Sequence, residues 1–197
     1  MARKRKDNFS EFKPDPQTTN WLKTAHLTQL QRLRLGKWLL YVLLIVLALV
    51  LQDVVMSQIS FFGATTNLPV CVILLITIIE GTESGSLFVL IAATLYYFTG
   101  TAPGAYSIGL LIFPGVLLGI FRQMYLHRSR GSIVLCAGMA AMIYELGLFL
   151  VGIFMKLTIW SRFGIFLLTG VIDILVMIPL YPLIHKIGLI GGSTWKE

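Results

Sequence analysis

The sequence predicts an all-α polytopic membrane protein with about six transmembrane helices and with both ends of the chain in the cytoplasm. Hydrophobic residues make up 56% of the 197 residues and charged residues only 13%, whereas soluble domains have about 45–50% and 25%. Mean hydropathy is +0.82. Apolar segments alternate with short polar turns, and most Lys and Arg lie in alternate turns. These features exclude an ordinary water-soluble domain.

The order of the segments divides the chain into a tail, a membrane domain and a second short tail. Residues 1–37 are polar and basic and predict a partly disordered cytoplasmic tail. Within it, residues 21–35 are interpreted as part of a solvated tail attracted to anionic lipids, and a short interfacial helix, for which the Leu spacing is sufficient, is the alternative. Residues 38–186 are expected to form the membrane domain and 187–197 a short cytoplasmic C-terminal tail. The predicted apolar segments are 38–56, 68–79, 87–98, 105–121, 132–155 and 163–184.

The second and third segments are short, which leaves the number of crossings open. Each has twelve residues, whereas a transmembrane helix usually needs about 17–25. We expect the two segments to gain length from their neutral flanks and to cross the membrane, giving six crossings. A re-entrant pair that buries residues 80–83 is the alternative and leaves four full crossings.

The positions of the basic residues predict the orientation. Of the 16 Lys and Arg, nine lie in residues 1–37, three in residues 122–130 and two after residue 185. Only Lys156 and Arg162 lie in a turn on the opposite side. Because short cytoplasmic loops keep their Lys and Arg, both termini are predicted to be cytoplasmic. The net charge of +7 is explained by this arrangement and does not indicate nucleic-acid binding.

Two carboxylates fall inside predicted membrane segments. Glu145 is near the middle of the fifth segment and Asp173 near the middle of the sixth. A charged carboxylate at the bilayer centre costs at least about 2.5–3.5 kcal/mol, so both are expected to face the bundle interior. We interpret them as structural hydrogen-bond partners or subunit contacts, and a proton or cation relay is the alternative. Gln52 and Asp53 are expected to cap the first segment near the outer headgroups.

The sequence contains no pattern typical of an enzyme. Nucleophile-elbow, phosphate-loop and dinucleotide-binding glycine patterns do not occur in a suitable context. His26, His127 and His185 lie in separate segments, and Cys71 and Cys136 lie inside apolar ones without other ligands nearby. We therefore expect no catalytic, cofactor or metal site.

Short patterns along the chain have a characteristic order. They are Leu51-Gln52, Pro69 at the start of the second segment, Glu80-Gly81-x-x-x-Gly85, Gly100-x-x-x-Gly104, the glycines Gly109, Gly115 and Gly119, and Tyr144-Glu145. Together they resemble the MreD family, the small membrane component of the bacterial rod-shape system. The chain departs from that family at Pro69-Val70, where Pro-Asp is usual, and at Tyr96-Tyr97, where an acidic residue is usual. The glycine stripe is a candidate for a lateral helix-packing face, although internal packing is the preferred interpretation.

The resemblance implies a multi-pass, non-enzymatic scaffold in the bacterial cytoplasmic membrane. Its implied partners are an MreC-like bitopic protein, an MreB-like filament, a SEDS glycosyltransferase and a class B penicillin-binding protein. The alternative is the substrate-binding subunit of an energy-coupling-factor vitamin transporter, which would need an outward polar pocket. The candidate structural or interaction residues are Gln52, Pro69, Glu80, Gly85, Gly104, Gly109, Gly115, Gly119, Tyr144, Glu145 and Asp173.

Overall fold

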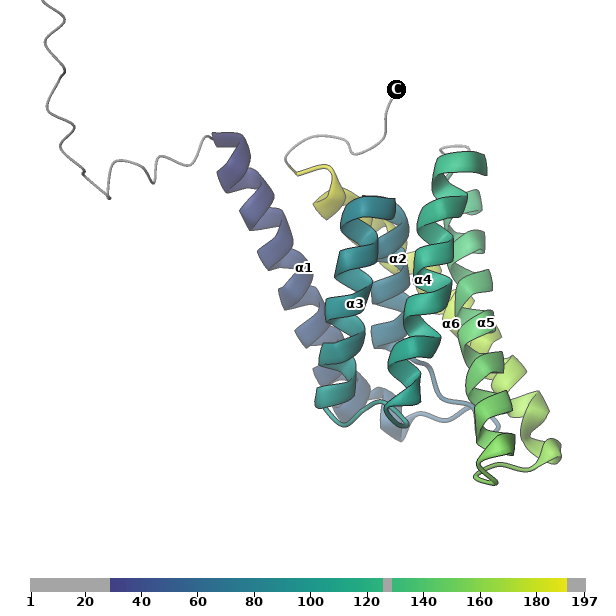
Figure 1. Cartoon of the computed structure of the whole chain (residues 1–197). Helices are drawn as coiled ribbons and strands as arrows, with labels where there is room; N and C mark the ends of the chain where they lie inside the picture. Colours follow the sequence, from purple (N-terminus) through teal and green to yellow (C-terminus); the bar gives the residue numbers. More distant parts are fainter. Residues whose placement is uncertain (1–28, 126–128, 191–197) are drawn as a thin grey trace, which may run out of the picture.

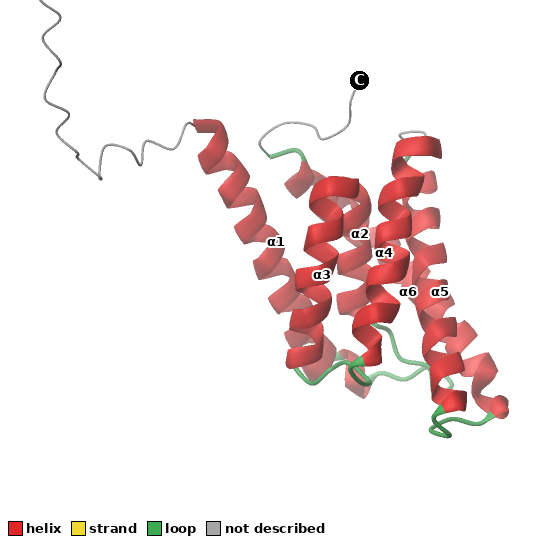
Figure 2. Cartoon of the chain, in the orientation of Figure 1, coloured by secondary structure: helices red, strands yellow, loops and turns green. Residues whose placement is uncertain are grey.

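In the part of the chain that the structure describes, the regular elements are helices (Figure 2). The structure is a computed structural model that describes residues 29–125 and 129–190. The six α-helices of these residues are α1 (Gln29–Val54), α2 (Leu68–Glu80), α3 (Thr82–Phe98), α4 (Tyr106–Tyr125), α5 (Arg130–Phe154) and α6 (Phe163–Gly188). Short 3₁₀ turns, η1 (Met56–Gln58) and η2 (Trp160–Arg162), follow α1 and precede α6. The expected all-α class is confirmed.

Four of the helices are long and apolar enough to cross a membrane. The candidate spans in the described residues are Gln31–Gln58, Tyr106–Gln123, Arg130–Phe154 and Trp160–Gly188. By contrast, α2 has 13 residues and α3 has 17. At 1.5 Å per residue α2 is about 20 Å long, shorter than the roughly 30 Å hydrocarbon core. The fold is thus compatible with a membrane protein with four candidate spans, and the six-crossing arrangement stays a prediction.

Helix α2 is the centre of the bundle. All 13 of its residues are buried, and it contacts each of the other five helices. Figure 1 shows α2 behind α3, with α1 on one side and α4, α5 and α6 on the other. Its sequence, LPVCVILLITIIE, is apolar apart from Thr77 and its last residue, Glu80. A helix of this kind is stable only when it is surrounded by other helices or lipid.

Helix pairs α3–α4 and α5–α6 pack closely through small residues. A Cβ atom at Gly115 would lie 2.7 Å from the Val89 side chain, and one at Gly119 would lie 3.0 Å from the Thr82 backbone. Gly109, by contrast, has no atom within 4 Å of a Cβ position. Two glycines of the predicted stripe therefore pack internally against α3, while Gly109 faces open space.

Helix α1 begins earlier than its apolar segment. It starts at Gln29 and runs through Arg32, Arg34 and Lys37 before the apolar residues begin at Trp38. The short interfacial helix that was the alternative for residues 21–35 overlaps this first part of α1, and residues 21–28 lie outside the described range. Figure 1 shows the beginning of α1 leaning away from the other helices.

Candidate functional site: polar clusters at both ends of the buried helix

The beginning of α2 is surrounded by polar side chains from three other helices. The backbone N–H of Asn67 donates to Asp173 Oδ1 (N···O 2.9 Å), and the N–H of Leu68 donates to Gln52 Oε1 (3.0 Å). The side-chain amide of Asn67 donates to Glu145 Oε1. We call Gln52, Asn67, Glu145 and Asp173 the amino-end cluster.

The need for this cluster follows from the burial of the first turn of α2. The first N–H groups of any α-helix have no partner within the helix, and in an apolar setting an unpaired N–H group is costly. Pro69, at the first turn of α2, has no N–H to satisfy. The helix dipole also places partial positive charge here, which stabilises nearby carboxylates. Glu145 and Asp173 thus have a structural reason to be inside the bundle.

One oxygen of the amino-end cluster has no hydrogen-bond partner. Asp173 is fully buried, and its Oδ2 accepts no hydrogen bond. The hydroxyl groups of Tyr96 and Tyr144 are near enough to Glu145 to interact with it electrostatically. On the α2 side, the thiol of Cys71 lies 3.7 Å from the Asp173 backbone carbonyl. The cluster therefore has a buried acceptor oxygen that is not used in capping α2.

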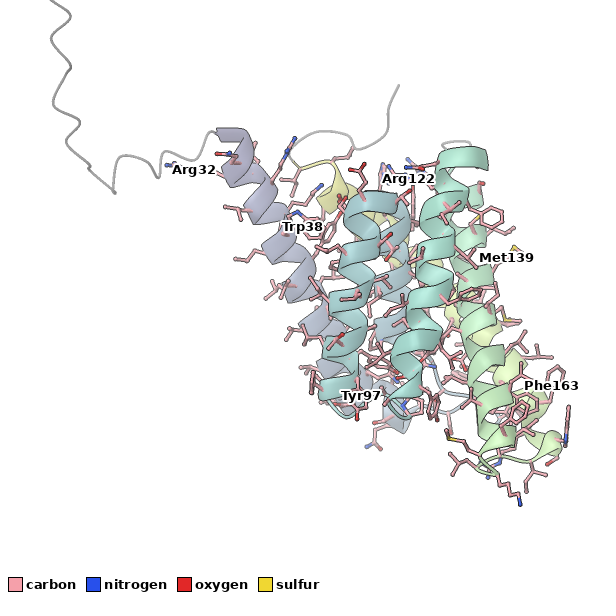
Figure 3. The ribbon with its side chains drawn as sticks, in the orientation of Figure 1. Arg32, Trp38, Tyr97, Arg122, Met139 and Phe163 are labelled. Atoms are coloured by element: carbon pink, nitrogen blue, oxygen red, sulfur yellow. The ribbon has the colours of Figure 1, made fainter. Side chains whose placement is uncertain are left out.

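The other end of α2 carries a charged cluster. Lys37 Nζ lies 2.9 Å from each carboxylate oxygen of Glu80, and the Tyr41 hydroxyl donates to Glu80 Oε1 (2.7 Å). Lys37 and Glu80 are both buried. The Arg122 guanidinium from α4 is close enough to interact with Glu80, and Figure 3 shows Arg122 near this end of the bundle. We call Lys37, Tyr41, Glu80 and Arg122 the carboxyl-end cluster.

The charges of this cluster offset an unfavourable position for Glu80. Partial negative charge at the end of a helix disfavours a carboxylate and favours cations. Lys37 of α1 and Arg122 of α4 supply two cations beside that end of α2. Through its interactions with them, the Glu80 carboxylate joins the three helices. A buried ion pair of this kind is strongly destabilised when one partner is removed.

The chain turns between α2 and α3 at one glycine. Gly81 has φ 89° and ψ −169°, a backbone conformation that is essentially restricted to glycine. A Cβ atom there would overlap the Arg122 guanidinium, and one at Gly85 would lie 2.6 Å from the Thr77 carbonyl oxygen. The Thr82 hydroxyl donates to the Gly119 carbonyl (2.9 Å) and joins this corner to α4. The Glu80-Gly81-x-x-x-Gly85 pattern thus forms a tight corner.

The structure brings most of the sequence candidates together around α2. The amino-end cluster contains Gln52, Glu145 and Asp173, with Pro69 in the adjoining first turn. The carboxyl-end corner is formed by Glu80 and Gly85, with Gly119 packed against it. Tyr144 is buried beside Tyr96.

Three candidates lie elsewhere, and three of the partners were not identified from the sequence. Gly115 packs against Val89 of α3. Gly104 is in the turn before α4, packed against Tyr106, and Gly109 has the open position described above. Asn67, Lys37 and Tyr41 were not expected to bind the carboxylates. Asn67 directly precedes Leu68-Pro69, a position typical of a helix start, and this was the available signal.

The described residues suit the joining of helices better than metal binding. They contain no group of three or more His, Cys, Asp or Glu that could hold a metal ion. The hydrogen bonds of the amino-end cluster join α2 to α1, α5 and α6, and the Lys37–Glu80 ion pair joins α2 to α1. No family model, no curated protein and no solved structure matches the chain.

Proposed function

We propose that the chain is a non-enzymatic membrane scaffold of the bacterial rod-shape machinery, similar to MreD. It would lie in the cytoplasmic membrane with six crossings and both termini in the cytoplasm. Its partners would be an MreC-like bitopic protein, an MreB-like filament, a SEDS glycosyltransferase and a class B penicillin-binding protein. The resemblance of short sequence patterns is the basis of this proposal.

The observation that supports the proposal most is where those patterns lie in the fold. Gln52, Pro69 and Glu145 are at the beginning of α2, while Glu80, Gly81 and Gly85 form its end and the turn into α3. These residues are far apart in the sequence, but all of them lie at the two ends of the central buried helix α2. Shared patterns of this kind are expected when a fold is shared, and the function is inferred from that likeness.

The distribution of polar groups also favours a scaffold. Glu80, Glu145 and Asp173 are inside the bundle, while the outward surface of α1 is formed by exposed Leu and Val side chains. A membrane protein with such a surface acts on other proteins by lateral helix packing and by its ends. The two polar clusters would keep the bundle in one arrangement while partners bind around it.

Depletion in a rod-shaped host tests this function. Cells that lose the protein should become round and swell, and the MreC-like partner should disperse from its normal pattern. A pull-down of the tagged chain in mild detergent should recover elongation proteins. Normal rods after full depletion, in a host without a paralogue, would contradict the proposal.

The amino-end cluster favours a second candidate function. The substrate-binding subunit of a vitamin transporter needs polar groups in an outward pocket, and Asp173 Oδ2 is a buried acceptor without a hydrogen bond. The other cluster groups that bind the beginning of α2 are already engaged, which is why we rank this function second. Retention of a vitamin by the purified chain through gel filtration, with vitamin uptake lost on depletion, would reverse the ranking.

A further inference from the structure

An apolar groove lies between α1 and α3. It has a volume of about 240 Å³ and is lined on one side by Trp38, Val42 and Ile45 and on the other by Phe88, Ile91 and Leu95. The groove exists because α1 packs mainly on α2 and leans away from the bundle at its beginning (Figure 1). It opens toward the side of the bundle that would face lipid.

Aromatic rings lie at the end of the groove nearer the beginning of α1. The ring centroid of Trp38 is 5.7 Å from that of Phe88 and 5.8 Å from that of Tyr41. Figure 3 shows Trp38 on the side of α1 that faces α3. Tyr41 also donates to Glu80, so the carboxyl-end cluster lies next to the Trp38 ring at this end of the groove.

Cationic side chains continue the α1 wall of the groove. Arg34 precedes Trp38 by four residues and therefore lies on the same helix face. Long helical side chains lean toward the helix N-terminus, so Arg34 extends beyond the aromatic rings. Arg34 and Arg32 are exposed, whereas Lys37 is paired with Glu80. On α3 the exposed Glu83, one turn before Leu87, carries the opposite charge.

The character of the walls favours a lipid chain over a helix. Transmembrane helices approach each other through Gly, Ala, Ser and Thr, whereas this groove is lined by Trp, Phe, Ile, Leu and Val with Ala92 as its one small residue. A flexible hydrocarbon chain can adapt to such an uneven apolar surface without close backbone contact. Cations beside the mouth of the groove match a negatively charged headgroup.

We propose that this groove binds one acyl chain of an anionic phospholipid, whose headgroup contacts Arg34. The bound chain fills the space between α1 and α3 and so contributes to the position of α1. This inference rests on the groove and its charges and is independent of the proposed scaffold function.

Fluorescence quenching of Trp38 tests the proposal. In the full chain, Trp21, Trp160 and Trp195 are replaced by Phe, and the purified protein in detergent is titrated with phosphatidylglycerol brominated on its acyl chains. We expect saturable quenching, with brominated phosphatidylcholine requiring about fivefold more lipid, since one basic residue near the headgroups contributes about 1 kcal/mol. Arg34→Gln should remove this preference, and Glu83→Gln should not weaken binding of phosphatidylglycerol.

Matched substitutions locate the binding site. Val42→Phe places a ring in the groove, and Val171→Phe makes the same change on α6 at nearly equal exposure, 48% against 49%. Val42→Phe should reduce the quenching by at least about half while Val171→Phe leaves it unchanged. Equal quenching in both variants would overturn the proposal. Efficient disulfide formation between two chains through Val42→Cys would also overturn it, because the groove would then bind a second copy.

Discussion

Single residues at the beginning of α2 show why a membrane bundle contains buried carboxylates. Asp173 Oδ1 accepts the N–H of Asn67, and Glu145 accepts from the side chain of the same residue. Both interactions need an acceptor oxygen, and neither needs a negative charge. The distinction between oxygen and charge can be tested by substitution.

Asp173→Asn should therefore keep the protein stable, whereas Asp173→Leu should destabilise it. Asn retains an acceptor oxygen at the same place, while Leu leaves a buried N–H without a partner, at a cost of about 1–3 kcal/mol. The measurement is thermal unfolding of the purified chain in detergent, followed by the loss of the monodisperse gel-filtration peak.

Glu145→Gln and Glu145→Leu form the matching pair, and Leu175→Asn on the exposed side of α6 serves as a control for a polar residue in lipid. If both amide variants are abundant and stable but fail to support rod shape, the structural interpretation is wrong. A titrating role for the carboxylates would then be required.

At the scale of elements, the structure depends on how α2 is held at its two ends. The groups at its beginning satisfy N–H donors, and those at its end place cations around Glu80. Lys37 and Glu80 are 43 residues apart in the chain, so their pairing joins α1 to α2 directly. This pair gives a test of the central position of α2.

Removal of Glu80 should be more damaging than removal of Lys37. Glu80→Met leaves Lys37 and Arg122 without their shared carboxylate, whereas Lys37→Met leaves Glu80 with Tyr41 and Arg122. We expect a loss of about 3–5 kcal/mol for Glu80→Met, the usual range when one partner of a buried ion pair is removed. Unfolding in increasing concentrations of a denaturing detergent measures the order of the variants.

The double variant Lys37→Met/Glu80→Met provides the internal control. Because it removes both members of the pair, it should be more stable than Glu80→Met alone. If both single variants and the double variant lose the same stability, the loss does not come from breaking the ion pair. It would then come from the packing of the Glu80 side chain or from its position at the end of α2.

The helices could be predicted from the sequence, but their partners could not. Apolar runs separated by Gly, Pro and charged turns place each element, and α2 begins at Leu68 as expected. The first apolar segment was predicted to begin at residue 38, whereas α1 begins at Gln29. Hydropathy marks where lipid contact begins, but the preceding Gln, Arg, Leu and Lys residues are good helix formers and extend the helix toward the N-terminus. Asn67 and Asp173 are 106 residues apart, and in helices that are apolar on all sides no periodicity indicates which face meets which neighbour.

At the scale of the whole molecule, the ends of the helices fall into two groups. The beginning of α1, the α2–α3 corner and the beginning of α5 lie toward one end of the bundle, and the α1–α2 and α3–α4 turns lie toward the other (Figure 1). The first group is the one rich in Lys and Arg, so it should face the cytoplasm. Helix α2 extends between polar clusters at its two ends, and its crossing of the membrane stays a prediction.

Cysteine labelling in cells tests the orientation and the number of crossings together. In a chain with Cys71→Ala and Cys136→Ala, single cysteines replace Ser60, Thr101, Ser129 or Glu83. Ser60 is chosen because it is exposed, whereas Thr66 in the same α1–α2 connection is buried. Ser60→Cys and Thr101→Cys should react with an impermeant thiol reagent in intact cells, whereas Ser129→Cys and Glu83→Cys should react only after permeabilisation. Reaction of Ser129→Cys in intact cells would reverse the orientation. Failure of Glu83→Cys to react in either condition would place the α2–α3 corner inside the membrane, and the bundle would then have four full crossings.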